Sequence, residues 1–162
     1  MTKENFKLLY DEYFDAIRRY LYYRSNDSEL STDIAQEVFM KVWEKQIKYE
    51  PGRTKSLLYK MAGDMFVSQI RKNKVADKYR ESINLEFKSD QSPEERLEYE
   101  ELKKHYERSL ANLSDKQRTV FLMNRLEEMT YNEIAQRLEL SVKAVEKRMS
   151  LALSELRKAI NI

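Results

Sequence analysis

Glycine and proline are scarce in this chain, and that scarcity limits the possible folds more than any other feature. Only two of each occur among 162 residues. Both residue types interrupt helices, so helices can run through almost the whole chain. Apolar residues recur every three or four positions, which predicts helices over residues 6–23, 29–45, 55–74, 93–111, 115–126, 131–138 and 142–160. The expected fold class is all-α.

Local charge divides the chain into parts of opposite sign. Lys60 to Arg80 holds six Lys/Arg and two Asp, whereas residues 81–101 hold eight acidic residues and two basic ones. Ser141 to Lys158 is basic again, with five Lys/Arg and two Glu. Two nucleic-acid-facing modules around an acidic connector would show this order, and solvated helix faces are the alternative. We expect two small helical domains, 1–75 and 93–162, joined by a linker over 76–92.

Several functional classes are disfavoured by composition. The chain has no cysteine and a single histidine, His105, which excludes disulfides, thiolate metal sites and cysteine nucleophiles. Its carboxylates do not cluster with a base as an acid–base or metal-dependent enzyme requires. No apolar run approaches the roughly 20 residues of a membrane span, and a signal-peptide core is missing. We therefore expect a cytoplasmic protein that is not an enzyme and holds no metal or cofactor.

The stretch "TYNEIAQRLELSVKAVEKRM", Thr130 to Met149, predicts two helices joined by a tight corner. Leu140 would fill the turn, and Ser141 would cap the second helix. That helix has an apolar arc and an opposite arc with Lys143 and Lys147, which suits insertion into a DNA major groove. The alternative is a plain helical hairpin with a solvated face.

A second motif, "DIAQEVFMKVWEK", Asp33 to Lys45, predicts a helix with one packing face. Its other face gathers Asp33, Gln36 and Glu37 around the apolar Met40. Such a face suits a protein partner, and an ordinary solvated surface is the alternative.

These motifs resemble those of bacterial RNA polymerase sigma factors. Leu113 to Ile160 is similar to the helix-turn-helix of region 4, which binds the −35 promoter element. "DIAQEVFMKVW" and "SLLYKMAGDMFVSQIRKNK" are similar to region 2, whose helices bind core polymerase and the −10 element. Both modules in this order resemble the extracytoplasmic-function (ECF) group of the sigma-70 family, which directs polymerase to promoters and assists DNA opening.

The resemblance assigns residues to three surfaces. The core polymerase surface, facing the clamp helices of the largest subunit, comprises Asp33, Gln36, Glu37 and Met40. The −10 surface comprises Tyr59, Lys60, Arg71, Lys72 and Lys74. The −35 surface comprises Arg118, Tyr131, Ser141, Lys143, Ala144, Glu146, Lys147, Arg148 and Ser150. Two alternatives remain for Tyr59 and Phe66, which could stack on DNA bases or lie in the core. The loop 49–55 could form the wall of a base pocket.

The resemblance also implies partners: core RNA polymerase through its clamp helices and β flap, promoter DNA, and an inhibitory anti-sigma factor that in this group is often a membrane protein. The acidic linker would thread through the polymerase cleft. A stand-alone helix-turn-helix regulator and a helical protein-binding adaptor are the alternatives.

Some residues depart from the family pattern. Gly63-Asp64 stands where Arg-Asn is frequent, Glu139 stands where glycine is frequent at the corner, and Glu146 and Leu151 occupy positions that are often basic. A non-glycine corner implies a left-handed backbone at Glu139 or another kind of turn. Glu146 could accept a hydrogen bond from cytosine or pair with Lys143.

Overall fold

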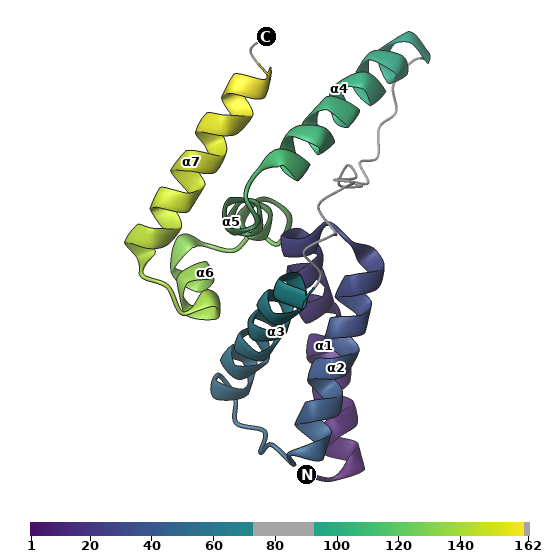
Figure 1. Cartoon of the computed structure of the whole chain (residues 1–162), viewed down its shortest axis with the longest axis vertical. Helices are drawn as coiled ribbons and strands as arrows, with labels where there is room; N and C mark the ends of the chain where they lie inside the picture. The colour runs from purple at the N-terminus through teal and green to yellow at the C-terminus, as the bar shows by residue number, and fades with distance from the viewer. Residues whose placement is uncertain (73–92, 161–162) are drawn as a thin grey trace.

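The structure, a computed structural model, describes residues 1–72 and 93–160, and α-helices joined by short loops make up this part of the chain (Figure 1). This part contains seven helices and no strand, which confirms the expected fold class. The helices are α1 (Lys3–Ser25), α2 (Ser28–Glu44), α3 (Arg53–Lys72), α4 (Pro93–Asn112), α5 (Asp115–Leu126), α6 (Tyr131–Leu138) and α7 (Val142–Ile160). The predicted linker 76–92 and the predicted DNA contact Lys74 lie outside the described residues.

The helices begin where side chains can satisfy their free N–H groups. The Ser114 hydroxyl accepts a hydrogen bond from the Gln117 amide at the start of α5. Thr130 and Glu133 form a reciprocal capping box at the start of α6. Helix α1 ends at Asn26, which adopts the left-handed conformation that asparagine tolerates. Short-range polar signals in the sequence therefore set these boundaries.

Helices α1, α2 and α3 pack around an aromatic-rich core. Phe39 of α2 is fully buried, and its ring lies 5.2 Å from Tyr10, 5.8 Å from Phe14 and 6.5 Å from Phe6. In the first turn of α3, the Thr54 hydroxyl accepts a hydrogen bond from the Glu50 amide, which lies before the helix, at 2.7 Å. Burying large aromatic rings stabilises a small core that would otherwise be thin.

Helices α4 to α7 form a second group around α7. Its core combines Leu122 and Met123 of α5, Ile134 of α6 and Met149 of α7, all buried. At the far end of α7, His105 Nε2 lies 2.6 Å from the Ala159 carbonyl oxygen. The N-terminal half of α4 extends beyond the rest of the group (Figure 1).

The two groups of helices are in contact. Helix α5 packs against α1, and α6 packs against α3. In Figure 1, α5 lies at the centre of the molecule, next to the end of α1. Two apolar residues, Ile70 of α3 and Val142 of α7, are exposed by 45% and 36%. Ile70 lies beyond Phe66, the last buried residue of α3, and Val142 is the first residue of α7, so both lie where packing ends.

Candidate nucleic-acid and protein-binding surfaces

The corner between α6 and α7 has the geometry of a helix-turn-helix. Glu139 caps the end of α6 with φ 53° and ψ 47°, the left-handed conformation, which is one of the two alternatives that the sequence left open there. The Leu140 amide donates to the Ala135 carbonyl at 2.9 Å, and the Ser141 hydroxyl accepts from the Ala144 amide at 3.1 Å. These two hydrogen bonds close α6 and open α7 within three residues, so the direction of α7 is defined by the corner.

Helix α7 has a buried arc and a polar arc. Val145, Met149, Ala152 and Leu156 are buried against the other helices. The exposed arc includes most of the predicted −35 residues of this helix: Lys143, Glu146, Lys147 and Ser150, with Ser141 at the corner. Ala144 and Arg148 are half-buried at its edge, as is Tyr131 at the start of α6. This arc presents hydroxyl and cationic groups together, as a helix in a major groove does.

Arg118 does not lie on that arc. It is only 5% exposed, and its guanidinium lies between α5 and the end of α1. Its Nε donates to the Tyr23 carbonyl at 2.6 Å and its Nη2 to the Arg24 carbonyl at 2.5 Å. Its Nη1 donates to the carbonyls of Ala111 and Leu113 at 3.2 and 3.0 Å. In this arrangement Arg118 faces the protein interior, because the carbonyl oxygens at the end of α1 attract a cation.

The predicted −10 residues of α3 fall into two sets. Lys60, Arg71 and Lys72 are exposed along the helix. Tyr59 is buried, with its ring 5.2 Å from that of Tyr20 and beneath the Arg137 guanidinium at 5.7 Å. Burial and the nearby Glu127 carboxylate raise the pKa of the Tyr59 hydroxyl, whereas Arg137 opposes this shift. Tyr59 is thus covered in this arrangement, and its predicted contact with DNA stays a prediction.

Gly63 lies where α3 approaches α1 closely. A Cβ atom at this position would lie 3.2 Å from the Tyr20 hydroxyl oxygen and 3.3 Å from Arg24 Nη1. Arginine, frequent here in the family, would displace both side chains. The departure at Gly63 therefore has a packing reason, whereas the neighbouring Asp64 is exposed.

The predicted core polymerase surface lies on one face of α2. Asp33, Gln36, Glu37 and Met40 are all exposed, and Met40 is exposed by 59%. Their backbone positions follow from Ile34, Ala35, Val38 and Phe39, which point into the core. The structure thus groups these four side chains, as the spacing of the sequence predicts.

An apolar groove adjoins this face and was not found in the sequence. It has a volume of about 660 Å³ between α1 and α2. Its lining includes Gln36 and Met40 of the predicted surface, together with Phe6, Tyr10 and Trp43. The Phe6 and Trp43 rings lie 5.3 Å apart. The spacing of Phe6 and Tyr10, four residues apart on the edge of α1, was the available signal, but it also fits an ordinary core.

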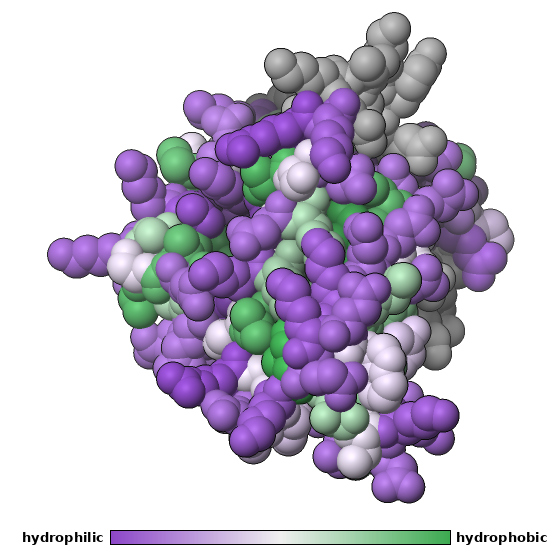
Figure 2. Space-filling model, turned by 60° about the horizontal axis from the view of Figure 1, so that its bottom comes forward, coloured by the Kyte–Doolittle hydropathy of each residue, from purple (hydrophilic) through white to green (hydrophobic). Residues whose placement is uncertain are grey.

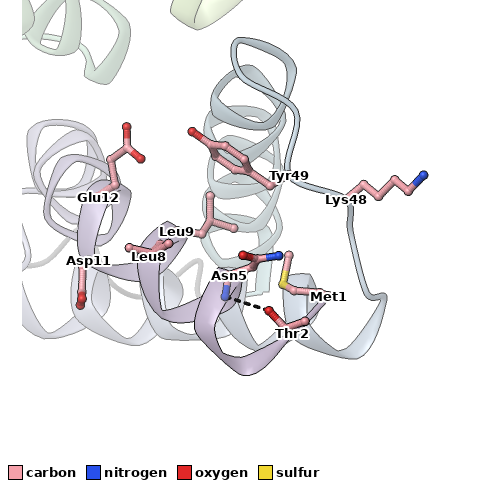
Figure 3. Close-up of a pocket in the computed structure, with 9 residues that line it drawn as sticks. All are labelled: Met1, Thr2, Asn5, Leu8, Leu9, Asp11, Glu12, Lys48 and Tyr49. Atoms are coloured by element: carbon pink, nitrogen blue, oxygen red, sulfur yellow. Dashed lines mark hydrogen bonds between the residues drawn. The ribbon is translucent and has the colours of Figure 1, made fainter.

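A second groove lies at the end of the molecule that carries the N-terminus. That end is mostly hydrophilic, with apolar surface visible between the charged side chains (Figure 2). The groove has a volume of about 790 Å³ between α1 and the connection from α2 to α3 (Figure 3). Leu8, Leu9 and Tyr49 line it together with Asp11 and Glu12. Lys48 and Met1, with its N-terminal amine, line the groove as well, so its lining carries charges of both signs, and a base pocket in the loop 49–55 stays a prediction.

Two kinds of feature are absent from the described residues. Among them, no group of three or more His, Asp or Glu side chains is placed to hold a metal ion. No helix in this part of the chain is long and apolar enough to cross a membrane.

Comparisons with known proteins relate both groups of helices to one family. The family model described as Sigma-70 region 2 matches residues 9–75, and that described as Sigma-70, region 4 matches residues 105–156.

Curated relatives match most of the chain. The ferric citrate uptake sigma factor FecI of Escherichia coli (strain K12) is 28% identical over 91% of this chain and 86% of its own length. The ECF RNA polymerase sigma factor SigM of Bacillus subtilis (strain 168) is 25% identical over 82% of this chain and 81% of its own length.

Solved structures share the fold over nearly the whole chain. The sigma factor RpoE from Bartonella quintana, in complex with the anti-sigma factor NepR, has a TM-score of 0.68 and 22% identity, covering 98% of both chains. CnrH, in complex with the cytosolic domain of CnrY, has a TM-score of 0.63 and 20% identity, covering 99% of this chain and 90% of its own.

Proposed function

Because this chain belongs to the ECF group of the sigma-70 family, we propose that it binds core RNA polymerase, directs it to specific promoters and helps to open the DNA there. We place region 2 at residues 1–75, the linker at 76–92 and region 4 at 93–162. The observation that carries the proposal is that both sigma regions are matched, in order, within one chain. A stand-alone regulator would need the helix-turn-helix but not region 2.

Core polymerase would bind the face of α2 formed by Asp33, Gln36, Glu37 and Met40. The exposed carboxylates and amide can accept and donate hydrogen bonds, while Met40 and the adjoining apolar groove supply an adaptable hydrophobic contact. A face of this composition suits the helical surface of the largest-subunit clamp. Region 4 would in addition contact the β flap.

Promoter DNA would contact region 4 through the exposed arc of α7. The Lys143 and Lys147 ammonium groups would contact phosphates or guanine. The Ser150 hydroxyl can donate a hydrogen bond to either. Glu146, exposed beside them, can accept from a cytosine amino group. Helix α3 would contact the −10 region through Lys60, with Arg71, Lys72 and Lys74 tracking the backbone of the opened strand.

Regulation would come from an anti-sigma factor. The RpoE and CnrH structures are complexes with NepR and with the cytosolic domain of CnrY. We propose that a protein of this functional class, often membrane-bound in the ECF group, covers both regions of this chain. Recovery of no inhibitory protein with the tagged chain from its native cell would contradict this.

The test of the proposed function combines core polymerase capture with run-off transcription on a library of genomic fragments. The expected result is stable capture of core polymerase and transcription from a few fragments. DNA binding without capture of polymerase would instead support the stand-alone regulator, and the α2 face would then be ordinary surface.

Two double variants test the division of labour. Asp33→Ala with Gln36→Ala should weaken capture of core polymerase and leave DNA binding unchanged, and Asp15→Ala, exposed on α1, is the control.

Lys143→Ala with Lys147→Ala should weaken promoter binding and lower the salt slope by about 2 if both contact phosphates. The control is Lys104→Ala with Lys116→Ala, which removes two exposed cations from α4 and α5. Equal loss of both functions in either variant would contradict the assignment.

A further inference from the structure

One apolar side chain interrupts the exposed polar arc of α7. Leu151 is exposed by 45%, although Met149 and Ala152, close to it in sequence, are only 2% and 0% exposed. The core therefore continues past this position, and Leu151 is exposed because its side chain points away from it. At about 100° per residue, Leu151 lies roughly 40° around the helix from Lys147, on the side of α7 away from the buried residues.

The side chains that surround Leu151 on α7 are all polar. Side chains meet on a helix surface when they are three or four residues apart. For Leu151 these neighbours are Lys147, Arg148, Ser154 and Glu155. Each ends in a charged or hydroxyl group, so no apolar partner on the same helix covers the leucine. Single exposed leucines are common on protein surfaces, but this one lies one turn beyond two predicted −35 residues, Lys147 and Arg148.

The major groove of DNA offers a leucine one kind of apolar group. The base edges there present hydrogen-bond donors and acceptors, together with the C5-methyl group of thymine. A leucine side chain can neither donate nor accept a hydrogen bond. Beside the polar edge of another base it would displace water without replacing the lost hydrogen bonds, whereas beside the methyl group it buries apolar surface of both partners. Thymine is therefore the base that an exposed leucine favours.

Leu151 lies far enough along α7 to face a base pair of its own. Four residues of a helix span roughly 6 Å along its axis, and stacked base pairs are about 3.4 Å apart. Where α7 lies along the groove, Leu151 is then about two base pairs beyond the position of Lys147. The two side chains therefore do not compete for the same base.

We propose that Leu151 is a specificity-determining residue, which contacts the C5-methyl group of a thymine in the promoter DNA that α7 binds. This rests on the proposed function and deepens it, since the exposed arc of α7 must enter the major groove. The cations of the arc supply affinity that does not depend on sequence where they contact phosphates. Leu151 adds a preference for one base pair.

The test removes a single methyl group from the DNA. The probe is a promoter fragment that the chain transcribes together with core polymerase. In its upstream half, each thymine in turn is replaced by uracil, which keeps the hydrogen-bonding groups and lacks only the C5-methyl group. The dissociation constant of the complex of full chain and core polymerase is measured for each duplex. With the unmodified chain, one replacement should weaken binding about fourfold, the factor that corresponds to about 0.8 kcal/mol for burial of one CH₂-sized group.

Variants of Leu151 show whether this side chain detects the methyl group. With Leu151→Ala, the thymine duplex and the sensitive uracil duplex should bind equally well, because the methyl group has lost its partner. Leu151→Met retains an apolar side chain of similar size and should keep most of the preference. Leu97→Ala is the matched control, since it removes a leucine that is 61% exposed on α4, and it should keep the full fourfold difference. A purely structural role of Leu151 would not produce this dependence on one methyl group.

Two results would overturn the assignment of Leu151. One is that no thymine methyl group affects binding, and the other is that Leu151→Ala keeps the same methyl dependence as the unmodified chain. Failure of the proposed function gives a different result. If the chain binds genomic fragments without capturing core polymerase, the uracil scan with the chain alone still decides the role of Leu151. If it binds no DNA with or without polymerase, both proposals are refuted.

Discussion

Replacing Glu139 by glycine should stabilise the protein without changing its contacts. Glu139 ends α6 in the left-handed conformation, with φ 53° and ψ 47°, and its side chain is exposed. A residue with a Cβ atom is strained there, and glycine is not. The corner that directs α7 should keep its shape, because the Leu140 and Ser141 hydrogen bonds involve neither the Glu139 side chain nor its Cβ atom.

The expected gain is the difference between two terms. Relief of the left-handed strain is worth about 1–2 kcal/mol. Glycine also gives the unfolded chain more freedom, which costs about 0.4–1 kcal/mol. The free energy of unfolding should therefore rise by between 0 and about 1.6 kcal/mol, with a central value of about 0.8 kcal/mol, which corresponds to a Tm increase of about 2–3 °C for a chain of this size.

Thermal and urea unfolding measured by circular dichroism would test this. Glu139→Ala is the matched control, because it removes the same carboxylate but keeps the Cβ atom, so it should not stabilise. A Glu139→Gly variant no more stable than Glu139→Ala would refute the reasoning, since the backbone strain would then contribute nothing. Promoter binding should be equal in all three proteins.

Two further changes probe other local features. Thr130→Ala removes the side chain that accepts from the Glu133 amide at 3.2 Å and should lower the free energy of unfolding by about 1 kcal/mol in urea, whereas Thr130→Ser should retain it. Burial, with Glu127 adding to it, raises the pKa of Tyr23 above its ordinary value near 10, so the unfolded chain ionises first and stability falls as the pH rises above that value. Tyr23→Phe should therefore lose less stability between pH 9 and 11 than the unmodified chain, and parallel curves of Tm against pH would contradict this.

Much of the local structure could be predicted from single residues and their spacing. Ser141 accepts the cap hydrogen bond expected of it, and Ser114 and Thr130 accept cap hydrogen bonds as serine and threonine commonly do at a helix start. The left-handed turn at Glu139 is one of the two alternatives that the sequence left open. The exposed face of α2 around Met40 also followed from its periodicity. These features depend on groups within about four residues of one another, where sequence spacing and distance in space agree.

Tertiary structure alone decided where Arg118 and Tyr59 lie. The periodicity of α5 does not show whether Arg118 is buried or exposed to solvent. Its hydrogen-bond acceptors, the carbonyls of Tyr23 and Arg24, are more than 90 residues away in sequence. The Arg19–Glu127 pair spans 108 residues. The free carbonyls at a helix end can bind any cation that tertiary packing places beside them. The local sequence does not indicate which cation that will be. The helices and their faces were therefore determined by the sequence, whereas the contact between the two groups of helices, and the burial of Arg118 and Tyr59 at it, became visible only once the helices were packed.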